Sequence, residues 1–423
     1  MPRKNRVVYF YDDALGKVYY GAKHPMKPPR LMMTHHLIVA YGLHEHLDMF
    51  KPREATPNEL AMFHAPEYVD FLNHVTPENQ EDVSEQLHKF GLDSDCPVFD
   101  DLARFCNLYS GASIEGAQFL NSGEYDIAIN WSGGLHHAKK AAASGFCYIN
   151  DLVLAILELL KYHTRVLYVD IDVHHGDGVE EAFYVTDRVM TASFHKYGDN
   201  FFPGTGSLTD VGEKNGRYYS VNVPMRDGLD DNTFRQLFRP IMSKVMEIFK
   251  PGAIVMQCGA DSLAQDRLGC FNLSLEGHAD AVRFMKSFGT PMLVTGGGGY
   301  TKANVARCWA YETAVLLDTQ IPEQLPQNAF YEYFEPEHKL KINASRDQTN
   351  HNTRAEVERL RADIIDNLRC LSYTPGVRMQ TLPPSHLVDL YDIDPHNSKE
   401  RMNKYIRQHL IVKDDPEDEH FGV

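Results

Sequence analysis

Residues 165–178 read RVLYVDIDVHHGDG, an apolar and β-branched run that turns into a polar loop containing glycine. The run predicts a buried strand over 165–173. Asp170, Asp172 and His174 stand at alternate positions, so on a strand they would project from one face. Buried charges cost free energy unless something pairs with them, and a divalent cation suits two carboxylates and an imidazole. A buried polar network that holds the following turn is the alternative.

The same pattern of a short apolar segment, a glycine-rich turn and a helical stretch recurs along the chain. We expect further strands at 125–130, 189–194, 218–223, 253–258 and 291–295, and helices at 151–162, 232–249, 275–288 and 304–317. Strands that alternate with helices indicate an α/β domain with a parallel sheet covered on both faces. Residues 30–121 are expected to be mainly helical, with a polar loop at 76–101. A capping box at Thr353 and Glu356 predicts a last helix.

Polar residues come directly after three more of the expected strands: His136 with His137, Asp261, and Tyr300. Ligands of open parallel α/β sheets bind beyond the carboxyl ends of the strands. We therefore expect these side chains to meet residues 170–174 at one rim. Each alone has an ordinary explanation as a capping, packing or buried aromatic residue, whereas their convergence favours a catalytic site.

The residue types suggest metal-assisted hydrolysis of an amide. Asp172, His174 and Asp261 are three ligands that leave coordination positions open, as catalytic zinc requires. A neighbouring histidine can act as base toward the attacking water and then as acid toward a leaving amine.

Further residues could support this chemistry. Asp170 and Asp177 are suited to hydrogen-bond the outer nitrogens of His136 and His137 and so set their protonation. Tyr300 follows a run of four glycines and could donate to a developing oxyanion opposite the metal.

These motifs make the sequence similar to the class I zinc-dependent histone deacetylases, from about Tyr9 to about Thr374. The matching segments are HPMKP at 24–28, INWSGGLHHAKK at 129–140, SGFCYIND at 144–151, YVDIDVHHGDGVEEAFY at 168–184, SFHKYG at 193–198, FFPGTG at 201–206, CGADSL at 258–263, DRLGCFNLS at 266–274 and GGGGYTKANVARCW at 296–309. The resemblance implies one α/β domain with a central, mainly parallel eight-stranded sheet, related to arginase. It also implies an enzyme that removes acetyl groups from lysine side chains of histone tails and other proteins, releasing acetate.

The resemblance assigns catalytic roles to numbered residues of this chain. Asp172, His174 and Asp261 would hold Zn²⁺. His137 would be the general base and acid, and His136, paired with Asp170, would act mainly electrostatically. Tyr300 would polarise the acetyl carbonyl.

The resemblance also implies a substrate tunnel. Gly145, Phe146 and Phe202 would line it around the lysine stem, and Leu268 would stand at its lip. Aromatic walls suit a stem of methylene groups. Asp95 would accept hydrogen bonds from the substrate backbone.

Structural monovalent cations, K⁺ or Na⁺, are implied as well. One would be held by Asp170, Asp172, His174, Ser193 and the Phe194 carbonyl. A second would be held by carbonyl groups of Phe183, Thr186, Val189 and Tyr219.

The expected partners are acetylated histone tails and a corepressor with a SANT-type domain, bound in some class I members through an inositol phosphate. The basic residues matched to that inositol-phosphate cleft are Lys23, Lys27, Arg30 and Arg267. Tyr19, Lys23 and Ala303 depart from the pattern of some members, which carry His, Gly and Arg there, so dependence on inositol phosphate is left open.

The charge balance fits a basic partner. The chain has 423 residues, with 42 Lys+Arg against 58 Asp+Glu, which argues against a wholly basic surface and against sequence-specific DNA binding. Residues 81–101 hold seven acidic residues and one lysine, which suits a lysine-rich tail. Residues 1–30 hold seven basic and two acidic residues, which suits a polyanionic regulator.

We expect a protein of the nucleus with an additional cytoplasmic pool. The seven cysteines are scattered and form no C-x-x-C, the first 13 residues lack the apolar core of a signal peptide, and no apolar run is long enough for a membrane span. The expected catalytic domain is 7–375. A polar, charged tail at 376–423 is expected to be largely disordered.

Four alternatives remain open at this point. One is a relative that acts on acetylated polyamines, and another is a catalytically silent chromatin scaffold. A third is an arginase-like dimanganese hydrolase. The fourth takes Gly296–Gly299 as a phosphate cradle, although it lacks the Lys-Ser/Thr of a P-loop.

Overall fold

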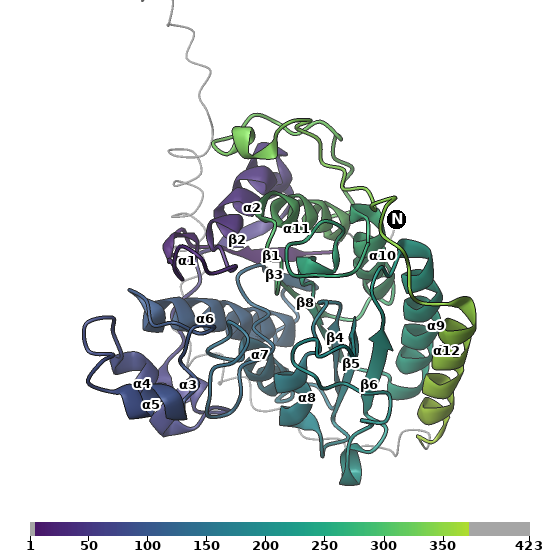
Figure 1. Cartoon of the computed structure of the whole chain (residues 1–423), viewed down its shortest axis with the longest axis horizontal. Coiled ribbons are helices and arrows are strands. Elements are labelled where there is room, and N and C mark those ends of the chain that lie inside the picture. Colours follow the sequence, from purple (N-terminus) through teal and green to yellow (C-terminus); the bar gives the residue numbers. More distant parts are fainter. Residues whose placement is uncertain (1–4, 372–423) are drawn as a thin grey trace, which may run out of the picture.

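A computed structural model describes residues 5–371. At its centre lies one sheet of eight strands in the order β2-β1-β3-β8-β7-β4-β5-β6 (Figure 1). All neighbouring strands are parallel. The strands are β1 (Val7–Phe10), β2 (Asp48–Phe50), β3 (Ile127–Asn130), β4 (Val166–Asp170), β5 (Val189–Lys196), β6 (Ser220–Met225), β7 (Ala253–Gln257) and β8 (Met292–Thr295). The expected α/β architecture is confirmed.

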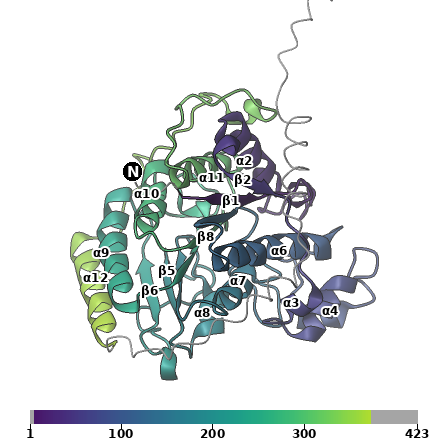
Figure 2. The same cartoon turned by 180° about the vertical axis from the view of Figure 1, so that it is seen from behind.

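Helices cover both faces of the sheet, as Figure 1 and the reverse view in Figure 2 show. One face is covered by α6 (Leu102–Asn121), α7 (Asp151–Leu159) and α8 (Asp177–Phe183). The other is covered by α2 (Pro29–Ala40), α9 (Asp231–Phe249), α10 (Leu275–Lys286) and α11 (Lys302–Leu316), with α12 (Arg354–Arg369) packed on α9. The shorter helices are α1 (Ala14–Lys17), α3 (Pro57–Leu60), α4 (Pro66–His74) and α5 (Ser84–Lys89), and the 3₁₀ turns are 43–46, 214–216, 260–262 and 331–334.

The β4 strand shows why the central strands are apolar throughout. Val166 and Tyr168 pack with the α6–α8 side, whereas Leu167 and Val169 pack with the opposite side. Side chains alternate between the faces of a strand, so a strand covered on both sides needs apolar residues at every position.

Beyond small shifts at the ends of other elements, the sequence-based expectations differ from the structure as follows. The strands β1 and β2 were not predicted. The polar segment 76–101 contains the short helix α5, whereas a loop was expected there. The β4 strand ends at Asp170, three residues before the predicted end.

The four adjacent strands β3, β8, β7 and β4 end at one rim of the sheet. The loops beyond them stay hydrogen-bonded to one another, for example from Ile171 N to Gln257 O at 3.2 Å and from Gly296 N to Asn130 O at 3.2 Å. This rim therefore offers a rigid frame for side chains. Within residues 5–371, no helix is both long and apolar enough to cross a bilayer. The predicted tail at 376–423 lies outside the described residues.

Candidate active site

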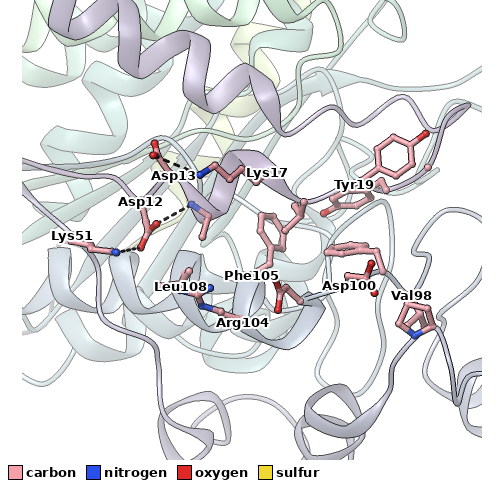
Figure 3. Close-up of a pocket in the computed structure, with 17 residues that line it drawn as sticks. Asp12, Asp13, Lys17, Tyr19, Lys51, Val98, Asp100, Arg104, Phe105 and Leu108 are labelled. Atoms are coloured by element: carbon pink, nitrogen blue, oxygen red, sulfur yellow. Dashed lines mark hydrogen bonds and ion pairs between the residues drawn. The ribbon is translucent and has the colours of Figure 1, made fainter. Parts of the chain in front are cut away.

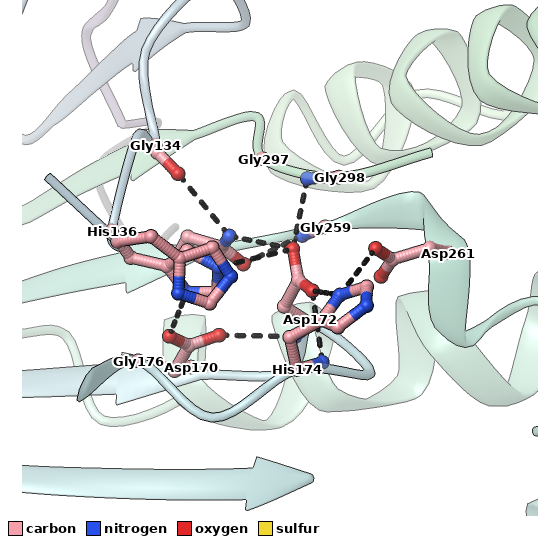
Figure 4. A network of polar contacts seen from close by, with 12 residues as sticks. Gly134, His136, Asp170, Asp172, His174, Gly176, Gly259, Asp261, Gly297 and Gly298 are labelled. Atoms are coloured by element: carbon pink, nitrogen blue, oxygen red, sulfur yellow. Dashed lines mark hydrogen bonds and ion pairs between the residues drawn. The ribbon is translucent and has the colours of Figure 1, made fainter. Parts of the chain in front are cut away.

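Polar residues expected at the strand ends meet at this rim. Figure 4 shows five of them: His136, Asp170, Asp172, His174 and Asp261. Asp170 ends β4, and Asp172 and His174 lie in the loop that follows. Asp261 lies in the short 3₁₀ turn after β7, and Tyr300 follows β8. The convergence expected from the parallel sheet is thus observed.

Asp172 and His174 do not extend the β4 strand, which corrects the period-two argument. Instead, the carboxylates of Asp170 and Asp172 each accept a hydrogen bond from the backbone N–H of the residue two positions further on. Asp172 N donates to Asp170 Oδ1 at 3.0 Å, and His174 N donates to Asp172 Oδ1 at 3.0 Å. Such local bonds let Asp compete with strand pairing and curl the chain. The three side chains still converge, although a turn rather than a strand brings them together.

Asp172, His174 and Asp261 form a buried cluster with the donor atoms of a metal site. Their ligand atoms lie within 4.8 Å of one another. His174 Nδ1 is 3.0 Å from Asp172 Oδ1 and 3.2 Å from Asp261 Oδ2. Burial lowers the pKa of His174, but the two carboxylates outweigh burial and raise that pKa to about 10. The pocket therefore favours a positive charge between the carboxylates.

The backbone and one amide side chain hold this cluster in place. Asp172 Oδ2 accepts from Gln257 Nε2 at 2.9 Å and from Gly298 N at 2.8 Å. Asp261 Oδ1 accepts from the backbone N–H of Val173 at 2.9 Å. A Cβ on Gly298 would overlap the Asp261 carboxylate, so only glycine allows this approach. Two carboxylates and an imidazole, oriented in this way, fit a divalent metal such as zinc.

His136 and His137 lie beside the cluster, and each is paired with its own carboxylate. His136 Nδ1 is 2.7 Å from Asp170 Oδ2, and His137 Nδ1 is 2.7 Å from Asp177 Oδ1. A carboxylate accepts only, so Nδ1 of each ring carries the hydrogen. The Nε2 atom of a neutral His137 is then able to accept a proton.

The two histidines differ in their electrostatic surroundings. Burial lowers the pKa of His136, but Asp170 and Asp172 outweigh it and raise that pKa to about 9. Burial and the neighbouring charge of His136 lower the pKa of His137 to about 3, against the effect of Asp177. A charged His136 beside a neutral His137 agrees with the expected division into an electrostatic residue and a base.

A residue that sequence reasoning missed holds the histidine loop. Asp151, at the start of α7, accepts from Leu135 N at 2.9 Å, from Gly134 N at 3.1 Å and from Ser113 Oγ at 2.6 Å. Its carboxylate is fully buried. The motif INWSGGLHHAKK contains Gly134 and Leu135, and the motif SGFCYIND ends with Asp151. Nothing in the spacing of the two motifs indicated that these residues are in contact.

Tyr300 is buried at the same rim. Its backbone N–H donates to Asp266 Oδ2 at 2.7 Å, which fixes the start of the segment after the glycine run. Burial, with the charges of Asp261 and Asp172, raises the pKa of Tyr300 well above its usual value. The phenol therefore keeps its proton and can donate a hydrogen bond.

The residues expected in the tunnel adjoin the histidines and Tyr300. The rings of Phe202 and His137 lie 4.9 Å apart, and those of Phe146 and Tyr300 lie 5.9 Å apart. Gly145 has φ +53°, and a Cβ there would lie 2.6 Å from His137 Cδ2. A side chain at this position would collide with the His137 ring.

Phe146, Asp95 and Leu268 line a cavity of about 450 Å³. The Asp95 side chain is exposed, while its backbone carbonyl is 3.1 Å from His24 Nε2. Leu268, expected at the lip of the tunnel, and Asp95, expected at the substrate backbone, thus lie in the same cavity as Phe146. We call this cavity the mouth.

The residues expected at monovalent cations are placed as follows. Ser193 lies opposite Asp170 in the β4–β5 register, next to Phe194 on β5. The second set lies around the α8–β5 turn and the start of β6: Phe183, Thr186, Val189 and Tyr219. Thr186 N donates to Phe183 O at 3.2 Å, so this turn is already closed by backbone bonds.

The four residues matched to the inositol-phosphate cleft do not share one surface. Lys23 and Arg267 are exposed, and Lys27 Nζ donates to the carbonyls of Gly21 and Ala22 at 3.0 Å. Arg30 is buried, because its guanidinium donates to the carbonyls of Gly297 and Gly299 at 2.6 Å and lies over the Trp309 ring. Arg30 therefore holds the glycine run from inside the fold. Its expected place in the inositol-phosphate cleft is corrected, because its guanidinium is buried and already bonded.

A larger cavity, about 740 Å³, lies between residues 12–21 and the start of α6 (Figure 3). Several of its charged side chains are already paired, such as Lys51 Nζ with Asp12 at 3.1 Å and Lys17 with Asp13 at 3.9 Å. None of the clustered aspartates and histidines lines it. Its size therefore does not make it the reaction site.

Comparisons with known proteins agree with this geometry. Residues 24–316 match the histone deacetylase domain. The chain is 56% identical to Histone deacetylase 9 of Arabidopsis thaliana over 415 residues, which cover 98% of this chain and 97% of that relative. It is 56% identical to Histone deacetylase 1 of Homo sapiens over 380 residues, 90% of this chain and 78% of the relative. The chain belongs to the class I histone deacetylase family.

Proposed function

We propose that this histone deacetylase works with one zinc ion held by Asp172, His174 and Asp261. The observation that supports this most is the position of His174 between two buried carboxylates, 3.0 and 3.2 Å away. When bound, the metal would supply Lewis acidity toward the acetyl carbonyl and the attacking water. Three protein ligands leave room for both oxygens.

The side chains around the cluster supply the proton transfers. His137, neutral and with its Nδ1 hydrogen directed at Asp177, accepts a proton from water at Nε2 and returns one to the lysine amine. The Tyr300 hydroxyl donates to the carbonyl oxygen as negative charge develops there. His136 keeps a positive charge nearby, balanced by Asp170.

The lysine stem lies between Phe146 and Phe202 in this proposal, and the peptide backbone crosses the mouth beside Asp95. Acetylated histone tails are strongly basic, so the acidic segment 81–101 attracts them. The acidic mouth thus favours a peptide over a small acetylated polyamine.

We also propose a wider setting for the enzyme. We expect it to repress transcription in the nucleus, with an additional cytoplasmic pool, as the catalytic subunit of a corepressor complex. Lys23, Lys27 and Arg267 remain candidates for an inositol phosphate at the SANT-type partner, without Arg30. Titrating inositol hexakisphosphate into the purified partner complex tests this, and unchanged affinity and activity would refute it. Monovalent K⁺ or Na⁺ would stabilise the fold at the two sets described above.

A comparison of substrates tests the proposal. Purified enzyme is given acetyl-lysine histone H4 peptides or acetylated polyamines, and released acetate is measured. We expect turnover on the peptide to exceed that on the polyamine at equal concentration. The reverse preference would refute the substrate class, and no acetate from either would favour a silent scaffold.

A further inference from the structure

A second buried cluster of titratable side chains lies directly behind the metal-ligand loop. It consists of His278 on α10 and of Cys308 and Glu312, one turn apart on α11. All three are fully buried. The mechanism above uses none of them, so their presence in the core needs an explanation.

Both ring nitrogens of His278 are hydrogen-bonded to protein atoms. Nδ1 is 2.6 Å from Glu312 Oε1, and Nε2 is 2.9 Å from the Gly259 carbonyl oxygen. A carbonyl only accepts, so Nε2 carries a hydrogen and donates it to Gly259. With both nitrogens engaged, the cluster fits a hydrogen-bonded relay better than a metal site.

Gly259 connects this relay to the metal ligands. It follows β7, two residues before Asp261, and its backbone N–H donates to Gln257 Oε1 at 2.8 Å. The same Gln257 side chain donates through Nε2 to Asp172 Oδ2. A Cβ on Gly259 would overlap the Asp172 carboxylate, so this peptide packs directly against one ligand and leads into another (Figure 4).

Helix α11 makes a second bond to the same segment. Trp309 Nε1 donates to the Cys258 carbonyl at 2.9 Å. Two consecutive carbonyls, those of Cys258 and Gly259, are thus held from behind by donors on α11 and α10. Ser262 Oγ adds a weaker bond to Gly259 O at 3.2 Å.

Packing alone does not account for the His278–Glu312 pair. Removing charges from water is costly, and a well-packed apolar pair often stabilises a core as well or better. What an apolar pair could not provide is the hydrogen bond to Gly259. Residues behind the ligands of a metal commonly set ligand orientation and affinity in this way.

We propose that His278, oriented by Glu312, is a positioning residue of the metal centre. Its Nε2–H holds the Gly259 carbonyl and thereby keeps the 257–261 segment, with Asp261, against Asp172. This inference rests on the proposed zinc site. It adds that residues of α10 and α11, outside the metal-ligand loop, hold one of the ligands in position.

The test replaces the pair by an apolar one, His278→Leu with Glu312→Leu. Zinc affinity is measured by chelator competition on the apoenzyme, together with Tm, kcat and KM. We expect Tm to stay close to the wild-type value, zinc affinity to fall about tenfold, and kcat to fall with little change in KM. The conservative variant Glu312→Gln keeps a hydrogen-bond partner for Nδ1, because its amide can accept through Oε1 or donate through Nε2. It should therefore bind zinc almost normally.

A core variant on α10, the helix that carries His278, separates an effect on metal positioning from a general loss of stability. Met285→Ala truncates a buried α10 side chain and should lower Tm while leaving zinc affinity unchanged. If the double variant does not fold, His278→Asn, which is too short to reach both partners, should weaken zinc binding in its place.

Three outcomes would overturn the inference. Wild-type zinc affinity in the double variant would show that the relay does not position the site. A second zinc equivalent in the wild type that the double variant loses would make the cluster a metal site. Wild-type protein that binds no zinc at all would refute the zinc assignment itself, and the inference with it.

Discussion

The Tyr300 hydroxyl can be removed with little disturbance to the fold. Tyr300→Phe keeps the buried ring beside Phe146 but deletes the hydroxyl proposed to donate to the developing oxyanion. We expect kcat on an acetylated histone peptide to fall by about 10²- to 10³-fold. Zinc content, measured by elemental analysis, should stay at the wild-type level.

Tyr41→Phe provides the matched control, because the Tyr41 hydroxyl bonds to the Pro322 carbonyl, away from the strand-end rim. It should leave kcat unchanged. A Tyr300→Phe enzyme with wild-type turnover would contradict the role given to this phenol.

Glu115 predicts a pH dependence of stability outside the site. Burial raises its pKa from 4.5 to about 7, with a partial offset from the Arg53 backbone N–H at 3.1 Å. The folded state therefore holds a proton that the unfolded state releases at lower pH. This makes the contribution of Glu115 to stability decline as pH rises from about 4.5 to about 7.

Glu115→Gln removes this titration while keeping an acceptor for Arg53. The free energy of unfolding of the variant, relative to the wild type, should rise by at most about 3 kcal/mol between pH 5 and pH 8. Denaturant titrations across this range measure the difference. A difference that does not change with pH would contradict the account.

Individual site residues were predictable to different degrees. Asp172, His174 and Asp261 follow apolar strands, so the parallel sheet alone indicated that they meet. Asp151 and Gln257 were missed because their roles are backbone and amide contacts between segments far apart in sequence. Such contacts leave no periodic signal. The side chains proposed for catalysis were thus predictable, whereas most of what orients them was not.

The α12 helix offers a local test of stability. Thr353 caps it, accepting from Glu356 N while the Glu356 side chain bonds back, and the helix packs on α9. Thr353→Ala should lower the free energy of unfolding by about 1 kcal/mol. Arg359→Ala, on an exposed face of the same helix, should have a much smaller effect in the same denaturant titration. Equal losses would show that the cap contributes nothing specific.

The elements that were predicted correctly share a strong pattern. Long amphipathic helices such as α9 carry clear periodicity, and buried strands such as β7 are continuous apolar runs bounded by turns. The β2 strand has three residues at the sheet edge, and α5 has no buried residue. Their placement depends on tertiary contacts, which a local pattern does not reveal.

The acidic segment 81–101 predicts a salt effect on the whole molecule. Attraction of a basic peptide weakens as the screening length shortens. We expect kcat/KM to fall several-fold between 50 and 300 mM NaCl for an acetyl-lysine peptide with basic flanks. A peptide with neutral flanks should change little.

A charge variant places this effect on the segment. Glu81→Gln with Glu85→Gln removes two exposed acids and should reduce the salt sensitivity without changing kcat on the neutral peptide. Equal salt sensitivity of both peptides would show that the segment does not steer the substrate.

Metal reconstitution tests the proposed zinc hydrolase as a whole. The enzyme is stripped by a chelator and assayed on an acetylated histone peptide after graded addition of Zn²⁺ or Mn²⁺. We predict no turnover in the stripped enzyme and full recovery at one zinc per chain, with no recovery in Asp261→Ala. Undiminished turnover without metal, or recovery only at two manganese ions per chain, would contradict the account.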